Sequence, residues 1–315
     1  MSYRTVVISN PSYLQISKLQ LHITQGDDAY TVPLEDIACI VLNHYQISLS
    51  ANLLSGCATN NIVLISCDEK HLPDGIFHSY LPHSRQNLVL QKQINLSQAF
   101  KKRVWQAIIK QKIVNQAVVL EKTNSGVNDI SNKLLNLASK ISSGDKENRE
   151  AQASRIYFPA LFGSEFTRLD KFKYSDDAII QNINSLLNYA YTIIRSIIIR
   201  TIVGYGLLPT LGICHDNQMN AFNLADDFIE PFRAFVDWYV WSMIFENIDI
   251  NLNKANKFKL IDCINFIIVI DGKNTTVINA IDVMLKSFIT CINTNSYEAL
   301  LLPSLPIKLE RSNIN

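Results

Sequence analysis

The sequence predicts an α+β protein, with a small β-rich domain at residues 1–86 followed by a larger all-α domain at residues 87–315. Short β-branched runs fill the first ninety residues, whereas long segments with helical apolar spacing follow. Between them lies YLPHSRQN (80–87), a polar segment with a proline that is typical of a linker. At 315 residues, with 48% hydrophobic and 18% charged side chains, the chain can bury a core in each domain.

Five runs in the first domain predict strands, because each is rich in β-branched residues and ends at a turn signal such as Asn-Pro, Gly-Asp-Asp or Asn-Asn. These runs are TVVISN (5–10), YLQISKLQLHIT (13–24), AYTVPL (29–34), IACIVLN (37–43) and NIVLIS (61–66). A helix near 47–58 is expected to interrupt them.

The second domain begins with a long helix predicted at 95–122, where Phe100, Val104 and Ile108 recur at helical spacing on one face. Further helices are predicted at 128–141, 145–162, 183–203, 221–245 and 274–292. One strand-like run, NFIIVI (265–270), departs from this pattern. The prediction for this domain is therefore all-α.

Several features favour a cytoplasmic protein without a membrane partner. The N-terminal apolar run stops at Asn10 and Pro11, too early for a signal peptide. The apolar region 192–213 is broken by two arginines, three glycines and a proline, so it predicts a buried core helix ending near Gly204. None of the six cysteines has CxxC spacing, which favours reduced, mostly buried thiols over a zinc ribbon or a disulfide framework.

Charge is unevenly distributed, although the whole chain carries +1. The formal charge is −3 over residues 1–90, +8 over 91–173 and −4 over 174–315. A basic block attracts a polyanion, and acids in an apolar setting offer a place for a metal cation. The candidate phosphate contacts in the basic block are Lys101, Lys102, Arg103, Lys110 and Lys112. The alternative for each of them is a solvated side chain on a long helix.

The segment LADDFIEPFR (224–233) mixes acids with large apolar residues. Asp227 and Glu230 lie three apart and share a helix face, where a divalent cation would relieve their repulsion. Pro231 is expected to kink the helix or start a new one. In the other explanation these acids lie in a first helical turn, and Arg233 pairs with Glu230. Spacing alone does not decide between the two.

Two more residues join this candidate site. His215 is the one histidine after residue 90 and follows a glycine- and proline-containing loop, so it is a candidate metal ligand or general base. A loop histidine hydrogen-bonded to a carbonyl is the alternative. Glu150 continues the buried stripe of the helix at 145–162, and a buried acid needs a partner or a metal.

Two stretches, NREAQASRIYFPALFG (148–163) and GLLPTLGICHDNQMNAFNLADDFIEPFRAFVD (206–237), resemble the metal-dependent integrase family of CRISPR adaptation, the first-numbered CRISPR-associated protein, in its type II form. The resemblance extends to the layout of a β-rich N-terminal domain joined to a helical C-terminal domain. It implies an enzyme that joins the 3′-OH ends of short foreign DNA fragments into a repeat array as new spacers, by transesterification of phosphodiester bonds.

The same resemblance assigns roles to individual residues. It implies that Glu150, His215 and Glu230 are catalytic and bind Mg²⁺ or Mn²⁺, with Asp227 in a supporting position. This sequence departs from the family at Ala151, where a glycine is often found, and it has Glu at 230 where some relatives have Asp. We expect the first departure to affect helix packing and the second to change the reach of the carboxylate.

The resemblance also implies partners. These are double-stranded DNA, as protospacer and repeat array, a second copy of the chain bound through the β-rich domain, and a dimer of a small ferredoxin-like second CRISPR-associated protein that bridges two homodimers into a heterohexamer. The effector nuclease is a further candidate partner. Two other functions stay open: a metal-dependent endonuclease acting on branched DNA, and a non-catalytic DNA-binding scaffold.

Overall fold

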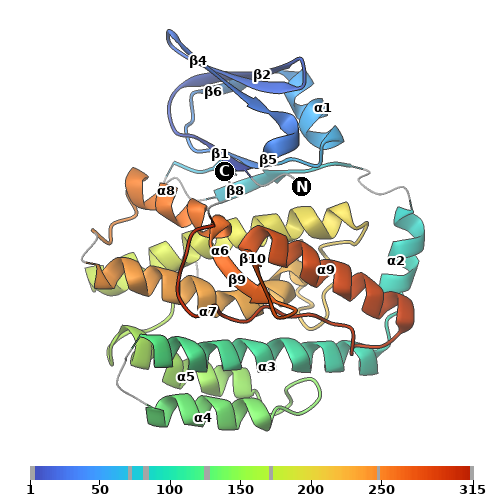
Figure 1. The fold of residues 1–315 in the computed structure, drawn as a ribbon, viewed down its shortest axis with the longest axis vertical. Helices are drawn as coiled ribbons and strands as arrows, with labels where there is room; N and C mark the ends of the chain where they lie inside the picture. The colour runs from blue at the N-terminus through green and yellow to red at the C-terminus, as the bar shows by residue number, and fades with distance from the viewer. Residues whose placement is uncertain are drawn as a thin grey trace. The chain divides into compact units, whose positions relative to one another are not determined.

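The computed structural model describes residues 4–69, 73–80, 85–123, 128–169, 173–246 and 249–312 (Figure 1). The chain is mixed α+β, with strands in its N-terminal part and mainly helices beyond, as the sequence predicts. By internal contacts it divides into a first unit of residues 1–90 and 192–208 and a second unit of residues 91–191 and 209–315. The first unit thus includes a segment that the prediction places in the second domain.

The segment 192–208 makes specific contacts within the first unit. Arg200 Nε donates a hydrogen bond to the carbonyl of Asn61 at 2.6 Å. Gly204 packs so closely on Asn61 that a Cβ at this position would lie 2.8 Å from the amide nitrogen of that side chain. An apolar helical pattern does not say which core a helix will join, so the sequence could not assign this segment.

The described residues of the first unit form two four-stranded sheets. One has the order β1-β5-β7-β8, in which β1, β5 and β7 are parallel and β8 is antiparallel to β7. The other has the order β4-β3-β2-β6, in which only the β2–β6 pair is parallel. The strands are β1 (Arg4–Ile8), β2 (Ser12–Ser17), β3 (Gln20–Gln25), β4 (Asp28–Pro33), β5 (Ile37–Leu42), β6 (Ile47–Leu49), β7 (Val63–Cys67) and β8 (Pro73–Phe77).

Apolar residues of both sheets and of helix α1 (Ala51–Thr59) form one core. On β2, buried Leu14 alternates with exposed Tyr13 and Gln15, the period-two pattern of a strand with one buried face. The buried members of this core are Ile8, Leu14, Leu21, Ile23, Leu34, Ile37, Ile40, Leu53, Cys57, Ile62 and Leu64.

Three details of the first unit differ from the prediction. The run 13–24 is two strands, because Lys18 and Leu19 take left-handed conformations, with φ of 50° and 60°, and turn the chain. Residues 47–49 form β6 instead of helix, and α1 starts after Ser50, whose hydroxyl caps its first turn. The sequence does not predict β8, since the proline, aspartate and glycine of PDGIF are rare in strands.

Helices follow the first unit's strands and continue through the second unit. They are α2 (Gln86–Ile94), α3 (Gln98–Lys122), α4 (Asn128–Ser139), α5 (Arg149–Phe162), α6 (Ala178–Gly204), α7 (Asn223–Phe245), α8 (Lys254–Asp262) and α9 (Val277–Thr294). The sequence predicts all of these except α2 and α8, and α6 ends at Gly204 as expected. The short helices η1 (Leu34–Asp36) and η2 (Cys263–Asn265) complete the series.

The prediction that the second domain is all-α is wrong. β9 (Ile267–Ile270) and β10 (Lys273–Thr276) form an antiparallel hairpin there. Asp271 and Gly272 make its two-residue turn, both with positive φ, of 52° and 67°. The sequence carries a strong local signal for this hairpin, an Asp-Gly pair after a β-branched run.

Helix α7 is the central helix of the second unit. It packs on α3, which in turn contacts α4 and α5 (Figure 1). Seventeen of its 23 residues are buried, so it has no wide solvated face. Three acidic residues of this helix, Asp227, Glu230 and Asp237, are consequently buried, whereas Asp226 is half-buried.

Within the described residues, two helices, α6 and α9, are long and apolar enough to cross a membrane by length and composition alone. Of their most apolar stretches, 78% and 56% are buried inside the protein, and the core helix of a soluble protein has the same length and composition. The six cysteines are all free and all lie in the described part of the chain. Four of them are buried, as expected, while Cys67 is half-buried and Cys214 is exposed.

Candidate active site

Glu150 lies in the first turn of α5, and the residues before the helix hold that turn in place. The carboxylate of Asp145 accepts hydrogen bonds from the backbone N–H groups of Arg149 at 2.9 Å and Glu150 at 3.1 Å. Asn148, the N-cap residue, adds a bond from the N–H of Ala151 at 3.4 Å. These caps orient Glu150, whose side chain is 29% exposed.

Asp227 and Glu230 lie on α7, and both are buried, at 0% and 4% exposure. The helix continues through Pro231, so the expected break does not occur. The carbonyl of Pro231 accepts a hydrogen bond from Asn115 Nδ2 on α3 at 2.9 Å. Both acids are therefore held inside the second unit by an unbroken helix.

Lys112 of α3 lies between Glu150 and Glu230, and we call these two acids the carboxylate pair. Its Nζ lies 2.5 Å from Glu150 Oε1 and 2.5 Å from Glu230 Oε2. Lys112, a predicted phosphate contact whose alternative was a solvated helix lysine, is not solvated: it is 5% exposed and its charge is engaged by the two carboxylates. On the other side, Arg233 Nε lies 2.7 Å from Glu230 Oε1, so the pairing that the alternative explanation predicted is present.

These contacts favour the charged forms of Glu230 and Lys112. Burial alone would raise the pKa of Glu230, but the charges of Arg233 and Lys112 outweigh it and lower the pKa to about 2. Burial alone would lower the pKa of Lys112, yet the negative charges of Glu230 and Glu150 leave it raised. The buried ammonium of Lys112 and the buried carboxylate of Glu230 therefore coexist as ions at neutral pH.

His215 lies on the loop at 205–222, which folds around the carboxylate of Asp227. Asp227 accepts hydrogen bonds from three successive backbone N–H groups, those of Ile213 at 2.5 Å, Cys214 at 3.2 Å and His215 at 3.1 Å. Gly212 makes this wrapping possible, because a Cβ there would lie 2.2 Å from the carbonyl oxygen of His215. The sequence did not identify Gly212 as a site residue.

The imidazole of His215 is oriented by the same carboxylate. Its Nδ1 lies 2.8 Å from Asp227 Oδ1, and since an ionised carboxylate can only accept, Nδ1 carries the proton and Nε2 is the nitrogen that can bind a cation. Trp105 packs edge-on against the ring at 5.6 Å. The bond to Asp227 raises the pKa of His215; burial opposes this, and the charges of Asp227 and Glu230 add to it.

The structure thus brings the four predicted residues together as two pairs. Glu150 and Glu230 share Lys112, and His215 is bonded to Asp227. Across the part of the chain that the structure describes, no three or more His, Cys, Asp and Glu side chains are grouped so that they could hold a metal ion. The predicted triad is therefore not assembled as a closed ligand set in this state.

A cavity of about 490 Å³ opens beside the carboxylate pair. Arginines and aromatic rings line it, and the sequence had not placed them at the site. The lining residues beyond the cluster described above include Arg155, Phe158, Phe166, Arg168 and Tyr191. Arg168 and Arg233 lie near the face of the Tyr191 ring, at 5.2 and 4.6 Å from its centre. A cavity with this lining suits an anionic ligand with planar groups.

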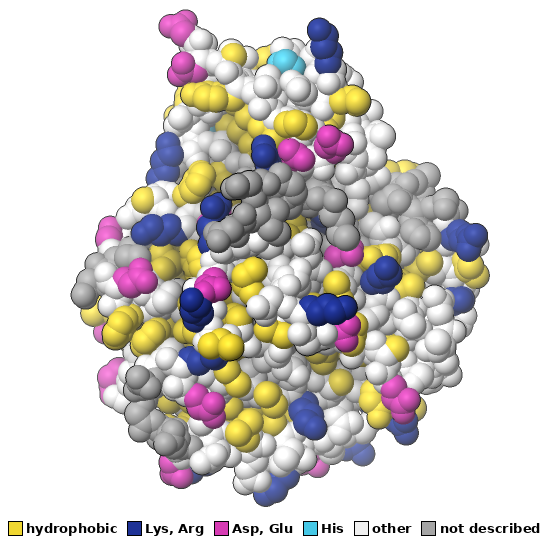
Figure 2. Space-filling model, in the orientation of Figure 1, with side chains coloured by type: hydrophobic (Ala, Val, Ile, Leu, Met, Phe, Trp, Pro, Cys, Tyr) yellow, Lys and Arg dark blue, Asp and Glu magenta, His cyan; other side chains and the backbone are white. Residues whose placement is uncertain are grey.

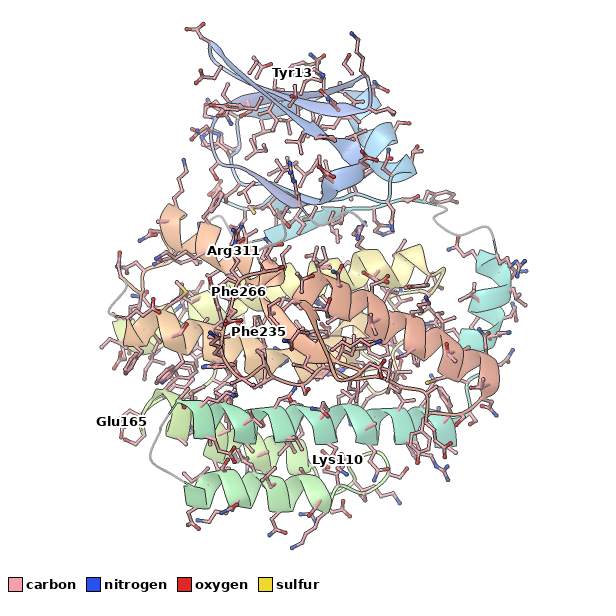
Figure 3. The ribbon with its side chains drawn as sticks, in the orientation of Figure 1. Tyr13, Lys110, Glu165, Phe235, Phe266 and Arg311 are labelled. Carbon is pink, nitrogen blue, oxygen red and sulfur yellow. The ribbon has the colours of Figure 1, made fainter. Side chains whose placement is uncertain are left out.

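The other residues of the basic block have different surroundings. Lys102, Arg103 and Lys110 are exposed on α3, where Figure 3 labels Lys110. Lys101 is half-buried and its Nζ donates to the carbonyl of Gly212 at 3.3 Å, so it braces the histidine loop. Figure 2 shows Lys and Arg side chains scattered over the visible face among acidic and apolar ones.

Comparison with known proteins identifies the family. Residues 5–257 match the family model described as CRISPR associated protein Cas1. The chain is 40% identical to the CRISPR-associated endonuclease Cas1 of Neisseria meningitidis serogroup C (strain 8013), over 98% of each protein.

Two solved structures have a similar fold. One is a casposase bound to integration product, with a TM-score of 0.77, 18% identity, and coverage of 95% of this chain and 92% of that one. The other is a Cas6-RT-Cas1--Cas2 complex, with a TM-score of 0.75, 17% identity, and coverage of 98% of this chain and 36% of that one. From the family match and the Neisseria relative, this chain belongs to the Cas1 family of CRISPR-associated proteins.

Proposed function

We propose that this chain is a divalent-metal-dependent integrase that joins the 3′-OH ends of short foreign DNA fragments into a CRISPR repeat array. The observation that carries the proposal is the carboxylate pair. Glu150 and Glu230 come from two separate sequence motifs, yet both line a cavity rich in arginine. The casposase of similar fold, whose structure contains an integration product, supports joining as the reaction.

The residues present fit a divalent metal by their chemistry. Two carboxylates and one imidazole are donors that Mg²⁺ and Mn²⁺ accept, and Glu150, Glu230 and Nε2 of His215 would provide them. Asp227 serves behind His215, because its oxygens already accept the loop N–H groups and Nδ1. A bound metal would polarise the scissile phosphate and stabilise charge on the departing oxygen.

The chain's other residues position the DNA. Arg155, Arg168 and Arg233 line the cavity and would bind phosphate oxygens next to the carboxylate pair. Lys102, Arg103 and Lys110, with Lys101 nearer the histidine loop, would follow the DNA backbone outside it. No covalent intermediate with the protein is required, because the attacking group is a DNA hydroxyl.

The proposed assembly follows the family. A second copy would bind through the β-rich unit, and a small second CRISPR-associated protein would bridge two such dimers. One structure of similar fold is a complex that names Cas1 and Cas2 together, which supports this partner. The effector nuclease remains a candidate additional partner.

A second candidate function is cleavage of branched DNA, with water in place of the 3′-OH. The curated relative's description as an endonuclease favours it. The two reactions need the same residues, so they differ in product and not in site.

The test is strand transfer of a labelled DNA duplex with 3′-OH ends into a repeat-containing plasmid, with the small partner protein and Mg²⁺ or Mn²⁺. Wild type is compared with Glu150→Gln, His215→Ala and the control Glu165→Gln, an exposed glutamate labelled in Figure 3. Joined product that disappears in the two site variants and in EDTA supports the proposal. Cleavage without joining favours the endonuclease, and DNA binding without metal-dependent turnover favours a non-catalytic scaffold.

A further inference from the structure

Lys112 occupies an unusual place for a lysine. Its ammonium group is buried between two carboxylates that come from different helices, α5 and α7. Since each oxygen is 2.5 Å from the same nitrogen, Glu150 Oε1 and Glu230 Oε2 can be no more than 5.0 Å apart. Oε2 of Glu230 makes no hydrogen bond of good geometry, so this contact is an ion pair whose angles are not ideal.

Glu230 has a second cationic partner that is held differently. Arg233 is one turn further along α7 and reaches Oε1, and its guanidinium lies 4.6 Å from the centre of the Tyr191 ring. Arg233 thus forms an i,i+3 ion pair with Glu230 on the same helix and a cation–π contact with Tyr191. Among the described residues, Lys112 forms ion pairs with the two carboxylates, which it reaches through a flexible stem.

A divalent cation would need the same space. Two oxygens bound to one Mg²⁺ at about 2.0–2.1 Å lie at most about 4.2 Å apart, so the carboxylate pair has only a small distance to close. The metal would then lie between the two oxygens, where Nζ lies now. Two positive charges cannot share that position, whereas either one alone relieves the repulsion of the carboxylates.

We propose that Lys112 is a built-in competitor for the metal: it holds Glu150 and Glu230 together in the metal-free protein and leaves that position when a divalent cation binds. The inference rests on the proposed function, in which these two carboxylates hold the metal. It assigns Lys112 as a positioning residue that sets the metal concentration at which the site fills. The displaced ammonium stays in the cavity, because Lys112 is one of its lining residues.

The first test is Mn²⁺ binding to the full-length protein, followed by electron paramagnetic resonance of the free ion. We compare wild type with Lys112→Met and with Lys110→Met, an exposed lysine on the same helix. Lys112→Met is expected to bind Mn²⁺ about tenfold more tightly, a typical coupling between two competing occupants, and Lys110→Met to bind as wild type does. Equal or weaker binding by a folded Lys112→Met overturns the inference.

Glu150→Gln separates this inference from the proposed function. If Mn²⁺ binding is unaffected in Glu150→Gln, the metal site itself is wrong and the proposed function fails. If binding depends on Glu150 but does not tighten in Lys112→Met, the competition alone is refuted.

A second measurement needs no variant, and so it holds even if Lys112→Met does not fold. Lysine side chains of wild type are acetylated with and without saturating Mn²⁺, and the modified residues are quantified by mass spectrometry. Lys112 is expected to become more reactive when Mn²⁺ is bound, while Lys110 stays constant. A Lys112 that stays protected with the metal bound would show that it never leaves the carboxylates.

Discussion

The two halves of the site are held by different kinds of interaction. The carboxylate pair is fixed by ion pairs between side chains of α3, α5 and α7. His215 and Asp227 are fixed by backbone N–H groups that converge on one buried carboxylate. Backbone hydrogen bonds do not depend on which cation is present, whereas ion pairs do. We therefore expect the histidine half to keep its geometry whether or not a metal is bound, and the carboxylate half to change with the cation that it holds.

The largest expected effect is a loss of activity in the carboxylate half, with little change in stability. Glu150→Gln should reduce strand transfer by more than about 100-fold. Loss of a residue that only supports a metal ligand costs about 10- to 100-fold, and Glu150 is proposed to be a ligand itself. The free energy of unfolding should change by less than about 1 kcal/mol, because the side chain is partly exposed and Glu230 retains Lys112. Urea denaturation measures the free energy of unfolding. If Glu150→Gln lowered it by as much as Asp227→Asn, the variant described next, the two halves of the site would not differ in this respect.

In the histidine half, stability and activity should fall together. Asp227→Asn places an NH₂ group among N–H donors, so we expect the free energy of unfolding to drop by about 2–4 kcal/mol. Strand transfer should fall by about 10- to 100-fold because His215 loses its orienting acceptor. Asp226→Asn, at the neighbouring half-buried acid, is the control and should have a much smaller effect on both. An Asp227→Asn protein as stable as wild type would mean that the loop does not depend on this carboxylate.

A smaller effect is expected where the loop backbone crowds His215. Gly212→Ala adds a Cβ 2.2 Å from the carbonyl oxygen of His215, and overpacking of this kind costs about 1–3 kcal/mol. Gly272→Ala is the control, since that glycine has φ of +67° but no atom within 4 Å of an added Cβ. Both variants should lower the melting temperature, but strand transfer should fall only in Gly212→Ala. Equal activity in the two would show that the loop tolerates displacement.

The pH dependence of the histidine half has a definite sign. The pKa of His215 is raised in the folded protein, mainly by its bond to Asp227. Protonation therefore stabilises the metal-free fold below pH 6.5, and this contribution is lost as pH rises through the raised pKa. Because a ligand imidazole must be neutral, Mn²⁺ binding should weaken as pH falls through the same pKa. An NMR titration of His215 checks this, and a pKa at or below 6.5 would contradict it.

The smallest effects are expected at the exposed lysines of α3. Lys110→Gln should reduce the slope of log K against log salt for DNA binding by about 1 if Lys110 contacts a phosphate. Strand transfer at saturating DNA should be unchanged, because the side chain is exposed and is not among the residues that line the cavity beside the carboxylate pair. Fluorescence anisotropy over a range of salt concentrations measures the slope. An unchanged slope would mean that Lys110 is simply solvated.

The sequence by itself determined features that depend on local pattern. Alternating β-branched runs give the strands of the first unit, and helical spacing gives α3, α5 and α7. The residues Glu150, His215 and Glu230 stand out because acids and an isolated histidine occur in apolar segments, and the family resemblance adds their roles. The hairpin of β9 and β10 was equally predictable, since its Asp-Gly turn is a local signal.

Only the tertiary structure decided which groups meet. Along α3, Lys110 and Lys112 look alike in sequence, yet one is exposed and the other is buried between two carboxylates. That difference arises because both α5 and α7 pack against α3, where each brings a carboxylate to Lys112, and contacts between distant segments leave no periodic trace in the chain. The same holds for Gly212, whose role depends on how closely the loop approaches Asp227.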